Sequence, residues 1–213
     1  SLLLVGPPGS GKSMLAQRFG GLLPPMTVDE ALQSAAIASL AGQFRLERWA
    51  VRPTCSPHHS ASSVALVGGG SPPRPGEISL AHHGVLFLDE LQEIPRSVLD
   101  ALRQPMEDGR VLISRAQQSL AFPARFALVG AMNPCPCGHA GQGARPCTCT
   151  PTDVSRHRAR VSGPLADRLD MTIHVPAGSI AALGERTEGE ASALVRARVV
   201  AARVRQHERY RRL

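Results

Sequence analysis

Residues 6–13 read Gly-Pro-Pro-Gly-Ser-Gly-Lys-Ser and directly follow the apolar run Leu-Leu-Leu-Val at positions 2–5. They match the pattern G-x-x-x-x-G-K-[ST], in which glycines let backbone N–H groups turn toward phosphate oxygens. In this pattern the lysine reaches the outer phosphates and the final hydroxyl ligates Mg²⁺. We expect a strand over 2–5 and a helix over 12–23. The segment predicts a nucleotide-phosphate loop made of Gly6, Pro7, Pro8, Gly9, Ser10, Gly11, Lys12 and Ser13.

Lys12 is also singled out by composition. It is the single lysine among 24 basic residues, because the other 23 are arginine. This bias fits a GC-rich coding sequence. It means that the chain uses arginine at every position where either basic residue would be suitable. A lysine has been kept at position 12, where a compact ammonium differs from the planar guanidinium. The composition therefore supports a phosphate-binding role for Lys12.

Acidic and amide side chains follow two further predicted strands. A buried strand over 85–88 ends in Asp89-Glu90, and a strand over 126–132 is followed by Asn133. Ligands of open α/β sheets lie at the carboxyl ends of the strands. We expect Asp89 to hold Mg²⁺, Glu90 to orient the attacking water and Asn133 to meet the γ-phosphate. The simpler alternatives are surface acids at a strand end and an Asn-Pro turn.

The remaining pattern predicts an α/β fold with a parallel sheet flanked by helices, because strands alternate with helices. Helices are expected over 28–41, 96–107 and 190–212, the last of which contains neither Gly nor Pro. Residues 110–114 and 119–122 are expected to form a β-hairpin. Residues 64–67 and 78–80 are expected to pair as strands around a loop rich in Gly and Pro.

Four of the five cysteines form two C-x-C pairs within the loop 133–152. Four thiolates in one loop can make a tetrahedral Zn²⁺ site, so Cys135, Cys137, Cys147 and Cys149 are candidate ligands. Free thiols and disulfides are the alternatives, although an ATPase belongs in the reducing cytosol, where disulfides are disfavoured. We interpret Cys55 as inert and the histidine doublets at 58–59 and 82–83 as loop or hydrogen-bonding residues, with metal ligation as the alternative.

The net charge of +7 is unevenly distributed. Residues 1–143 carry 11 basic and 10 acidic side chains, a net +1, whereas residues 144–213 carry 13 and 7, a net +6. A basic C-terminal third favours a polyanion such as nucleic acid as partner, or is a solvated helix. Aromatic residues are only 3%, which argues against single-strand binding by base stacking. There is no apolar run long enough to predict a membrane span.

These residues, in this order, resemble the magnesium-chelatase-like AAA+ ATPases, and within them the ComM (YifB) type. The resemblance covers nearly the whole chain and is far more specific than a phosphate loop alone. The segments that carry it are 6–13, 57–62, 68–70, 73–82, 84–91, 105–111, 133–138 and 162–168.

The resemblance implies a ring-forming ATPase of the bacterial cytoplasm, with a hexamer as the expected ring and ATP and Mg²⁺ as cofactors. Asp89 and Glu90 would be its Mg²⁺-binding and water-activating pair, and Asn133 its γ-phosphate sensor. Arg168 would be a finger that reaches the ATP of the next subunit. From the residues alone, a local Asp–Arg surface pair is the alternative for Arg168.

The resemblance also implies a division of the chain. Residues 1–176 would form the AAA+ nucleotide-binding core, and residues 177–213 would begin a helical lid. The chain starts without Met, so we expect it to be part of a longer protein. The segments 64–80 and 110–122 resemble pore-facing elements, with Arg74 and Arg115 near their tips as candidate DNA contacts.

The function implied by the resemblance is a DNA helicase that drives branch migration during natural transformation. Two alternatives share the same ATPase core. One is the ATPase subunit of a complex that inserts Mg²⁺ into a porphyrin. The other is an AAA+ remodeller of protein partners, in which the basic C-terminal segment is only a solvated helix.

Overall fold

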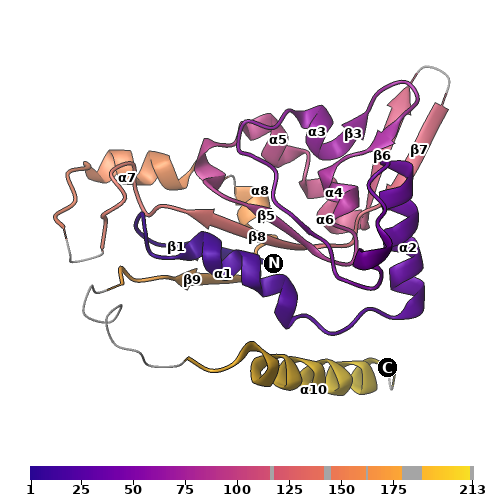
Figure 1. The fold of residues 1–213 in the computed structure, drawn as a ribbon. Helices are drawn as coiled ribbons and strands as arrows, with labels where there is room; N and C mark the ends of the chain where they lie inside the picture. The colour runs from indigo at the N-terminus through magenta and orange to yellow at the C-terminus, as the bar shows by residue number, and fades with distance from the viewer. Residues whose placement is uncertain (116–117, 142–144, 162, 179–188, 212–213) are drawn as a thin grey trace.

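The computed structural model describes residues 1–115, 118–141, 145–161, 163–178 and 189–211 (Figure 1). Its centre is a five-stranded sheet in the order β2-β5-β8-β1-β9, and every pairing within it is parallel. The strands are β1 (Leu2–Val5), β2 (Thr54–Cys55), β5 (Val85–Leu88), β8 (Ala127–Met132) and β9 (Met171–His174). The predicted α/β class is confirmed, as are the strands at 2–5 and 85–88.

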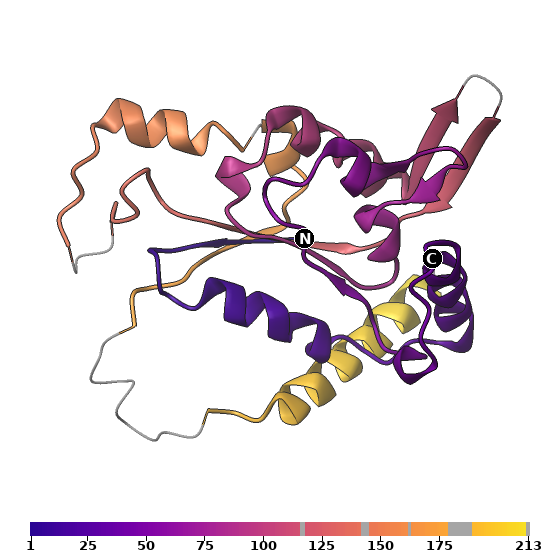
Figure 2. The ribbon, with the colours of Figure 1, turned by 45° about the horizontal axis from the view of Figure 1, so that its top comes forward.

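Both faces of the sheet are buried at β5, which explains why this strand consists only of apolar residues. Alternate side chains of a strand point to opposite faces. Val85 and Phe87 pack with Ala16 of α1 (Lys12–Phe19) on one face, while Leu86 and Leu88 pack with the helices on the other. Figure 2 shows the sheet between α1 on one side and the helices α3 to α6 on the other.

The first two helices form close to where the sequence predicts them. Helix α1 ends at Phe19 and continues as a 3₁₀ turn, η1 (Gly20–Leu22), so the predicted helix over 12–23 is two elements. Helix α2 (Val28–Leu40) begins at a capping box, in which the Thr27 hydroxyl accepts the Glu30 N–H and the Glu30 carboxylate accepts the Thr27 N–H. A short 3₁₀ turn, η2 (Leu46–Arg48), precedes β2.

The predicted strand pair at 64–67 and 78–80 is wrong. These residues form helices α3 (Ser63–Val67) and α4 (Glu77–Leu80), and only β3 (Gly68–Gly69) and β4 (Arg74–Pro75) pair between them. The Ser62 hydroxyl caps α3 by accepting the Ala65 N–H at 3.2 Å. Leu66 and Ile78 are buried in the main core, and a short buried apolar run is compatible with either a helix or a strand.

The predicted helix over 96–107 is also divided. After β5 and the turn η3 (Leu91–Glu93), the chain forms α5 (Arg96–Asp100) and α6 (Arg103–Asp108). Pro105 lacks the N–H that would bond to the carbonyl of Ala101, so a continuous helix loses a hydrogen bond there. The prediction of helical structure is confirmed, but its continuity is not.

The predicted β-hairpin is confirmed as β6 (Arg110–Arg115) and β7 (Gln118–Pro123). One of its faces is buried through Val111, Ile113 and Phe122. Two further helices, α7 (Pro151–Arg158) and α8 (Gly163–Ala166), were not predicted, and neither were β2 and β9. Their apolar runs are too short or too interrupted to give a periodic signal.

Helix α10 (Ser192–Tyr210) confirms the predicted C-terminal helix within two residues at each end. It contacts η1, the turn after α1, through Arg196, whose Nε donates to the carbonyl of Gly21 at 2.8 Å. Among the helices that the structure describes, none combines the length and the apolar character needed to cross a bilayer.

Candidate functional site

The predicted site residues come together at the carboxyl ends of three adjacent strands. Strand β8 lies between β1 and β5 (Figure 1). Asn133, which follows β8, therefore lies between the phosphate loop after β1 and the Asp89-Glu90 pair after β5. All of these elements line one cavity of about 720 Å³, together with residues 56–59 of the loop after β2.

The phosphate loop has the backbone that its glycines permit. Gly9 and Gly11 have φ angles of 75° and 85°, a left-handed conformation that other residues rarely adopt. A Cβ at Gly6 would lie 2.3 Å from the carbonyl oxygen of Val175, which is too close for any side chain. The loop then passes directly into α1, whose free N–H groups favour an anion.

Lys12 is buried at the centre of this loop, with 8% of its surface exposed. Its ammonium donates to the carbonyl oxygens of Gly6 and Pro7, both at 2.8 Å, and to the Asn133 Oδ1 at 3.3 Å. Burial lowers the pKa of Lys12, while the nearby Asp89 carboxylate acts in the opposite direction. The structure thus brings the predicted phosphate ligand against the predicted γ-phosphate sensor.

Ser13 and Asp89 meet on the other side of the cavity. The Ser13 hydroxyl donates to the Asp89 Oδ2 at 2.5 Å. A hydroxyl and a carboxylate are hard oxygen ligands, which Mg²⁺ prefers together with phosphate oxygens and water. The two side chains therefore fit a divalent cation bound to a nucleotide, as the sequence predicts.

Glu90 stands beside them in an unusual backbone conformation. Its φ and ψ are 48° and 47°, in the left-handed region where a residue other than glycine is strained. The side chain is about half exposed in the cavity, and its Oε2 lies 3.1 Å from the Nδ1 of His59. Its own N–H donates to the Asp89 Oδ1 at 2.9 Å. Strain of this kind is concentrated at functional sites.

His59 is the site residue that sequence reasoning missed. The sequence pattern at 58–59 does not indicate that this doublet belongs to the nucleotide site. His58 does contact the Ser60 hydroxyl at 2.8 Å, but both rings also line the cavity and His59 faces Glu90. The only sequence signal was the presence of the doublet in the segment 57–62, one of those that carry the family resemblance.

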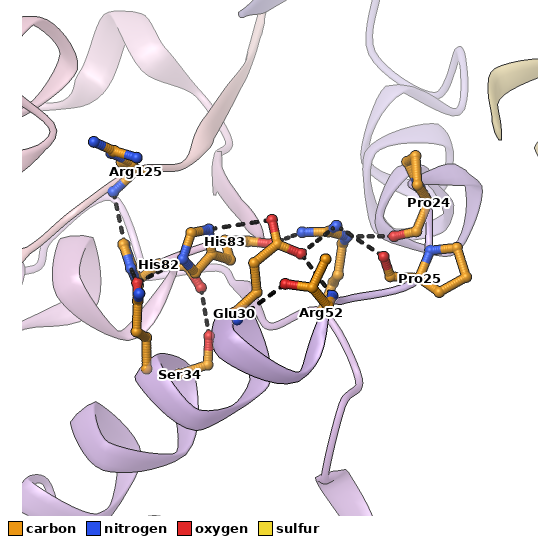
Figure 3. A network of polar contacts seen from close by, with 10 residues as sticks. Pro24, Pro25, Glu30, Ser34, Arg52, His82, His83 and Arg125 are labelled. Carbon is orange, nitrogen blue, oxygen red and sulfur yellow. Dashed lines mark hydrogen bonds and ion pairs between the residues drawn. The ribbon is translucent and has the colours of Figure 1, made fainter. Parts of the chain in front are cut away.

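The second doublet belongs to a polar network away from the cavity (Figure 3). The His82 Nδ1 accepts the N–H of Arg125 at 2.9 Å, and its Nε2 lies 3.0 Å from the Gln33 Oε1. The His83 Nε2 contacts the same Gln33 oxygen at 2.9 Å. Burial lowers the pKa of His82 to about 4, which is consistent with a neutral ring. The prediction of a hydrogen-bonding role holds for this doublet.

The same network fixes the start of α2. Arg52 donates to the Glu30 carboxylate at 3.1 Å and to the carbonyl oxygens of Pro25 and His83 at 3.2 and 2.6 Å (Figure 3). Ser34 donates to the carbonyl of His82 at 2.9 Å. These contacts join α2 to the segment before β5 and give the network a structural role.

The four candidate metal ligands form a cluster in the loop after Asn133. The sulfur of Cys135 lies 3.4 Å from that of Cys137 and 3.8 Å from that of Cys147, and the last two are 3.6 Å apart. With Cys149, all four sulfurs lie within 4.8 Å of one another. Backbone N–H groups of Thr148 and His139 lower the pKa of Cys137 to about 5.

The geometry agrees with metal binding better than with disulfides. In a tetrahedron with Zn–S bonds of about 2.3 Å, neighbouring sulfurs are about 3.8 Å apart. A disulfide would require about 2.05 Å. The remaining thiol, Cys55, is half-buried, and burial raises its pKa to about 12 with a further contribution from Glu77. A raised pKa keeps the thiol protonated and lowers its reactivity, which agrees with the prediction that Cys55 is inert.

A known protein family matches most of the chain. The family described as "Magnesium chelatase, subunit ChlI" matches residues 1–183. The chain belongs to this family. Membership implies ATP and Mg²⁺ as the cofactors of the cavity, and the resemblance recognised in the sequence is confirmed.

Individual relatives support the same family assignment. The chain is 52% identical over 216 residues to "Uncharacterized protein YifB" of Escherichia coli (strain K12), covering 100% of this chain and 42% of the relative. It is 53% identical over 214 residues to "Competence protein ComM" of Haemophilus influenzae, covering 98% and 41%. The chain thus spans about two fifths of the length of these relatives.

Among solved structures, NtrX from Brucella abortus in complex with ADP matches 83% of this chain and 32% of its own, with 16% identity and a TM-score of 0.48. This likeness is too distant to support an inference about the present family member.

Of the arginines that the family resemblance implies, Arg74 and Arg168 do not line the cavity. Arg168 follows α8 and donates from its Nε to the Glu107 Oε1 at 3.0 Å, and both side chains are exposed. Arg74 is exposed in β4. Arg115 ends β6 opposite Gln118, and its side chain lies outside the described part of the structure. A surface ion pair for Arg168 is thus present, with Glu107 rather than a neighbouring Asp as partner.

Proposed function

We propose that this chain is the ATP-binding and ATP-hydrolysing core of a ring-forming motor that acts on DNA. The observation that carries the proposal is the 2.5 Å contact between Ser13 and Asp89 in the cavity that Lys12, Glu90 and Asn133 also line. Hydrogen-bond donors for phosphate, oxygen ligands for a metal ion and the half-exposed Glu90 carboxylate are thus gathered at one end of the sheet. Family membership supports the ATPase activity.

Each residue has a role that follows from its position. Lys12 exchanges its contacts with the carbonyls of Gly6 and Pro7 for the β- and γ-phosphates, and the backbone N–H groups of residues 9–13, which follow the two prolines, hold the phosphate oxygens. Ser13 and Asp89 hold Mg²⁺, which neutralises phosphate charge when bound. Glu90 accepts a hydrogen bond from the attacking water and orients it. Asn133 positions the γ-phosphate through its amide.

We further propose that the chain works within a ring, with a hexamer as the expected size. The core would be residues 1–176, and residues 177–213 would begin a helical lid. Arg168 would reach the γ-phosphate held by the adjacent subunit. Arg168 does not line the cavity of its own subunit, and its ion pair with Glu107 is exposed to solvent and therefore exchangeable. Both observations support this assignment.

DNA is the partner that we propose for the ring, in the bacterial cytoplasm. The net +6 of residues 144–213 and the exposed Arg74 support it, since phosphate contacts dominate nucleic-acid affinity. Arg115 is the second proposed pore contact. The name of the Haemophilus influenzae relative, "Competence protein ComM", supports a role in competence. Branch migration during natural transformation is the process that we propose.

One experiment tests this function directly. ATP hydrolysis by the full-length protein is measured without DNA, with duplex DNA and with a four-way junction. We expect DNA to stimulate turnover severalfold, most strongly for the junction, and stimulation to fall with rising salt. The matched control is Glu90→Gln, which should stay inactive with every DNA. ATP turnover that is independent of all DNA substrates would contradict the DNA motor.

The specific alternative is an ATPase subunit that drives Mg²⁺ insertion into a porphyrin, because the matched family carries that description. The second alternative function is an AAA+ remodeller of protein partners. For either function, the ATPase would respond to partner proteins and ignore DNA, so the same assay separates them from the DNA motor.

We also propose that Cys135, Cys137, Cys147 and Cys149 bind one Zn²⁺. The sulfur–sulfur distances of 3.4 to 3.8 Å support a tetrahedral site. Metal analysis of the purified protein should find one zinc per chain. Absence of metal together with four freely titrating thiols would disprove it.

A further inference from the structure

The cysteine cluster lies against the nucleotide site at two points. The first is Gly138, which comes directly after Cys137 and is buried with a φ of 83°. A Cβ built on Gly138 would lie 2.6 Å from the Cδ and 2.9 Å from the Cγ of Pro8. Because Pro8 belongs to the phosphate loop, the cysteine loop is in direct contact with that loop.

The second point is Asn133. The cysteine loop leaves β8 at Asn133, and α7 follows it directly after Cys149 and the capping residue Thr150. His157, buried in the last turn of α7, donates from its Nε2 to the carbonyl oxygen of Asn133 at 3.0 Å. The start of the cysteine loop and the helix that follows the loop therefore meet at Asn133, the residue that faces Lys12.

The described contacts within this loop are made mainly by its sulfur atoms. Pro134, Cys135 and Gly138 are buried, whereas residues 145–148 are exposed. The two halves contact each other through the sulfur–sulfur approaches and through the Cys137 N–H, which donates to the Cys149 sulfur at 3.4 Å. Bonds from four thiolates to one metal ion would hold these halves together, whereas neutral thiols form only weak hydrogen bonds.

We propose that the metal held by the four cysteines positions the nucleotide site. It fixes Gly138 against Pro8 and, through α7 and His157, fixes the backbone of Asn133. Occupancy of the metal site then sets how well the phosphate loop and the γ-phosphate sensor are ordered for ATP. This inference rests on the proposed zinc site and nucleotide site, but its structural part can be tested without ATP.

The first test is amide hydrogen exchange in the full-length protein without nucleotide. Peptides that cover residues 6–13 and 127–133 are compared between the zinc-loaded protein and the double variant Cys147→Ser/Cys149→Ser, with Cys55→Ser as the control. We expect exchange to rise severalfold in both peptides for the double variant and to be unchanged in the control. Equal protection in the two proteins, with loss of zinc confirmed, would overturn the proposal.

The second test separates the contact from the metal. Gly138→Ala inserts a methyl group against Pro8, whereas Gly141→Ala is a matched control, because Gly141 also has a positive φ (73°) but no atom within 4 Å of its Cβ position. Both variants should retain one zinc per chain. A misplacement of about 1 Å can cost about 100-fold in rate, so we expect Gly138→Ala to lose roughly 10- to 100-fold in ATP turnover. Gly141→Ala should stay close to the wild type.

The outcomes distinguish the two proposals. Equal turnover and equal exchange in Gly138→Ala and Gly141→Ala would disprove the coupling while the ATPase stands. Metal-dependent protection of residues 6–13 in a protein that hydrolyses no ATP would support the coupling and disprove the ATPase function.

Discussion

The Ser13 hydroxyl and the Asp89 carboxylate lie 2.5 Å apart although 76 positions separate them in the sequence. The strand order explains this contact. Parallel strands place all of their carboxyl ends at one edge of the sheet, and only β8 lies between the strands that precede these residues. The same edge receives Asn133 from β8 itself. Three short strands thus determine the positions of the phosphate, metal and γ-phosphate ligands, and each ligand can be tested by substitution.

Lys12→Ala should abolish measurable ATP binding. Lys12 is expected to contact two phosphates, and each hydrogen bond to a charged group contributes about 1.5–3 kcal/mol, so affinity should fall by at least about 100-fold. Titration calorimetry with a non-hydrolysable ATP analogue measures the loss. Arg18→Ala, an exposed change on the same helix, is the control and should bind normally. Retained affinity in Lys12→Ala would mean that the loop does not hold phosphates through this ammonium.

Glu90→Gln should bind ATP but turn it over at least about 100-fold more slowly. The amide preserves the size of the side chain and leaves Ser13 and Asp89 intact, but it cannot act as a base toward water. Single-turnover hydrolysis with ATP in the full-length protein is the measurement, and Glu47→Gln, which changes an exposed carboxylate in η2, is the control. Normal turnover in Glu90→Gln would assign water activation to another residue.

Whether an element could be predicted from the sequence depended on how distinctive its local sequence pattern is. The phosphate loop, β5 and β8 are predictable because each has a strong local pattern, and they bring with them Lys12, Ser13, Asp89 and Asn133. Strand β2 has only two residues, and in the four residues of β9, Met-Thr-Ile-His, apolar residues alternate with polar ones, so β9 lacks the continuous apolar run of β1 and β5. The contact of His59 with Glu90 could not be predicted, because it depends on where the loop after β2 returns to the sheet.

The stability of the chain should decrease as the pH falls from about 6.5 toward 4. The pKa of His82 is near 4 in the folded protein and near 6.5 when unfolded, so only the unfolded state takes up a proton in this window. His83, whose pKa is also lowered by burial, acts in the same direction. Each group contributes at most about 1.4 kcal/mol per pH unit.

Urea unfolding of the 213-residue chain between pH 7.5 and 5 measures this slope. His82→Asn keeps an acceptor for the Arg125 N–H but does not titrate, so its slope should be smaller than that of the wild type. His58→Asn, at an exposed ring, should leave the slope unchanged. An identical slope in the wild type and His82→Asn would show that the ring is already solvated in the folded state.

Arg168 should act on the nucleotide of the adjacent subunit. In this chain its guanidinium donates to Glu107 and does not line the cavity that holds Lys12 and Glu90. Its planar set of donors suits the charge that develops on a transferring phosphoryl group. Such fingers contribute roughly 10³–10⁵ in rate. Arg168→Ala should therefore bind ATP nearly normally and lose almost all hydrolysis.

Mixing experiments in the full-length protein decide whether this action is between subunits. Arg168→Ala and Lys12→Ala are each inactive alone, but a mixed ring contains interfaces at which an intact phosphate loop faces an intact Arg168. Plotting the ATPase rate against the mixing ratio should give a curve that is zero at both ends and has a maximum between them. Glu107→Gln, which only releases the arginine from its surface partner, should stay active and controls for loss of the ion pair. If rings shown to be mixed remain inactive at every ratio, Arg168 acts within its own subunit or only supports the fold.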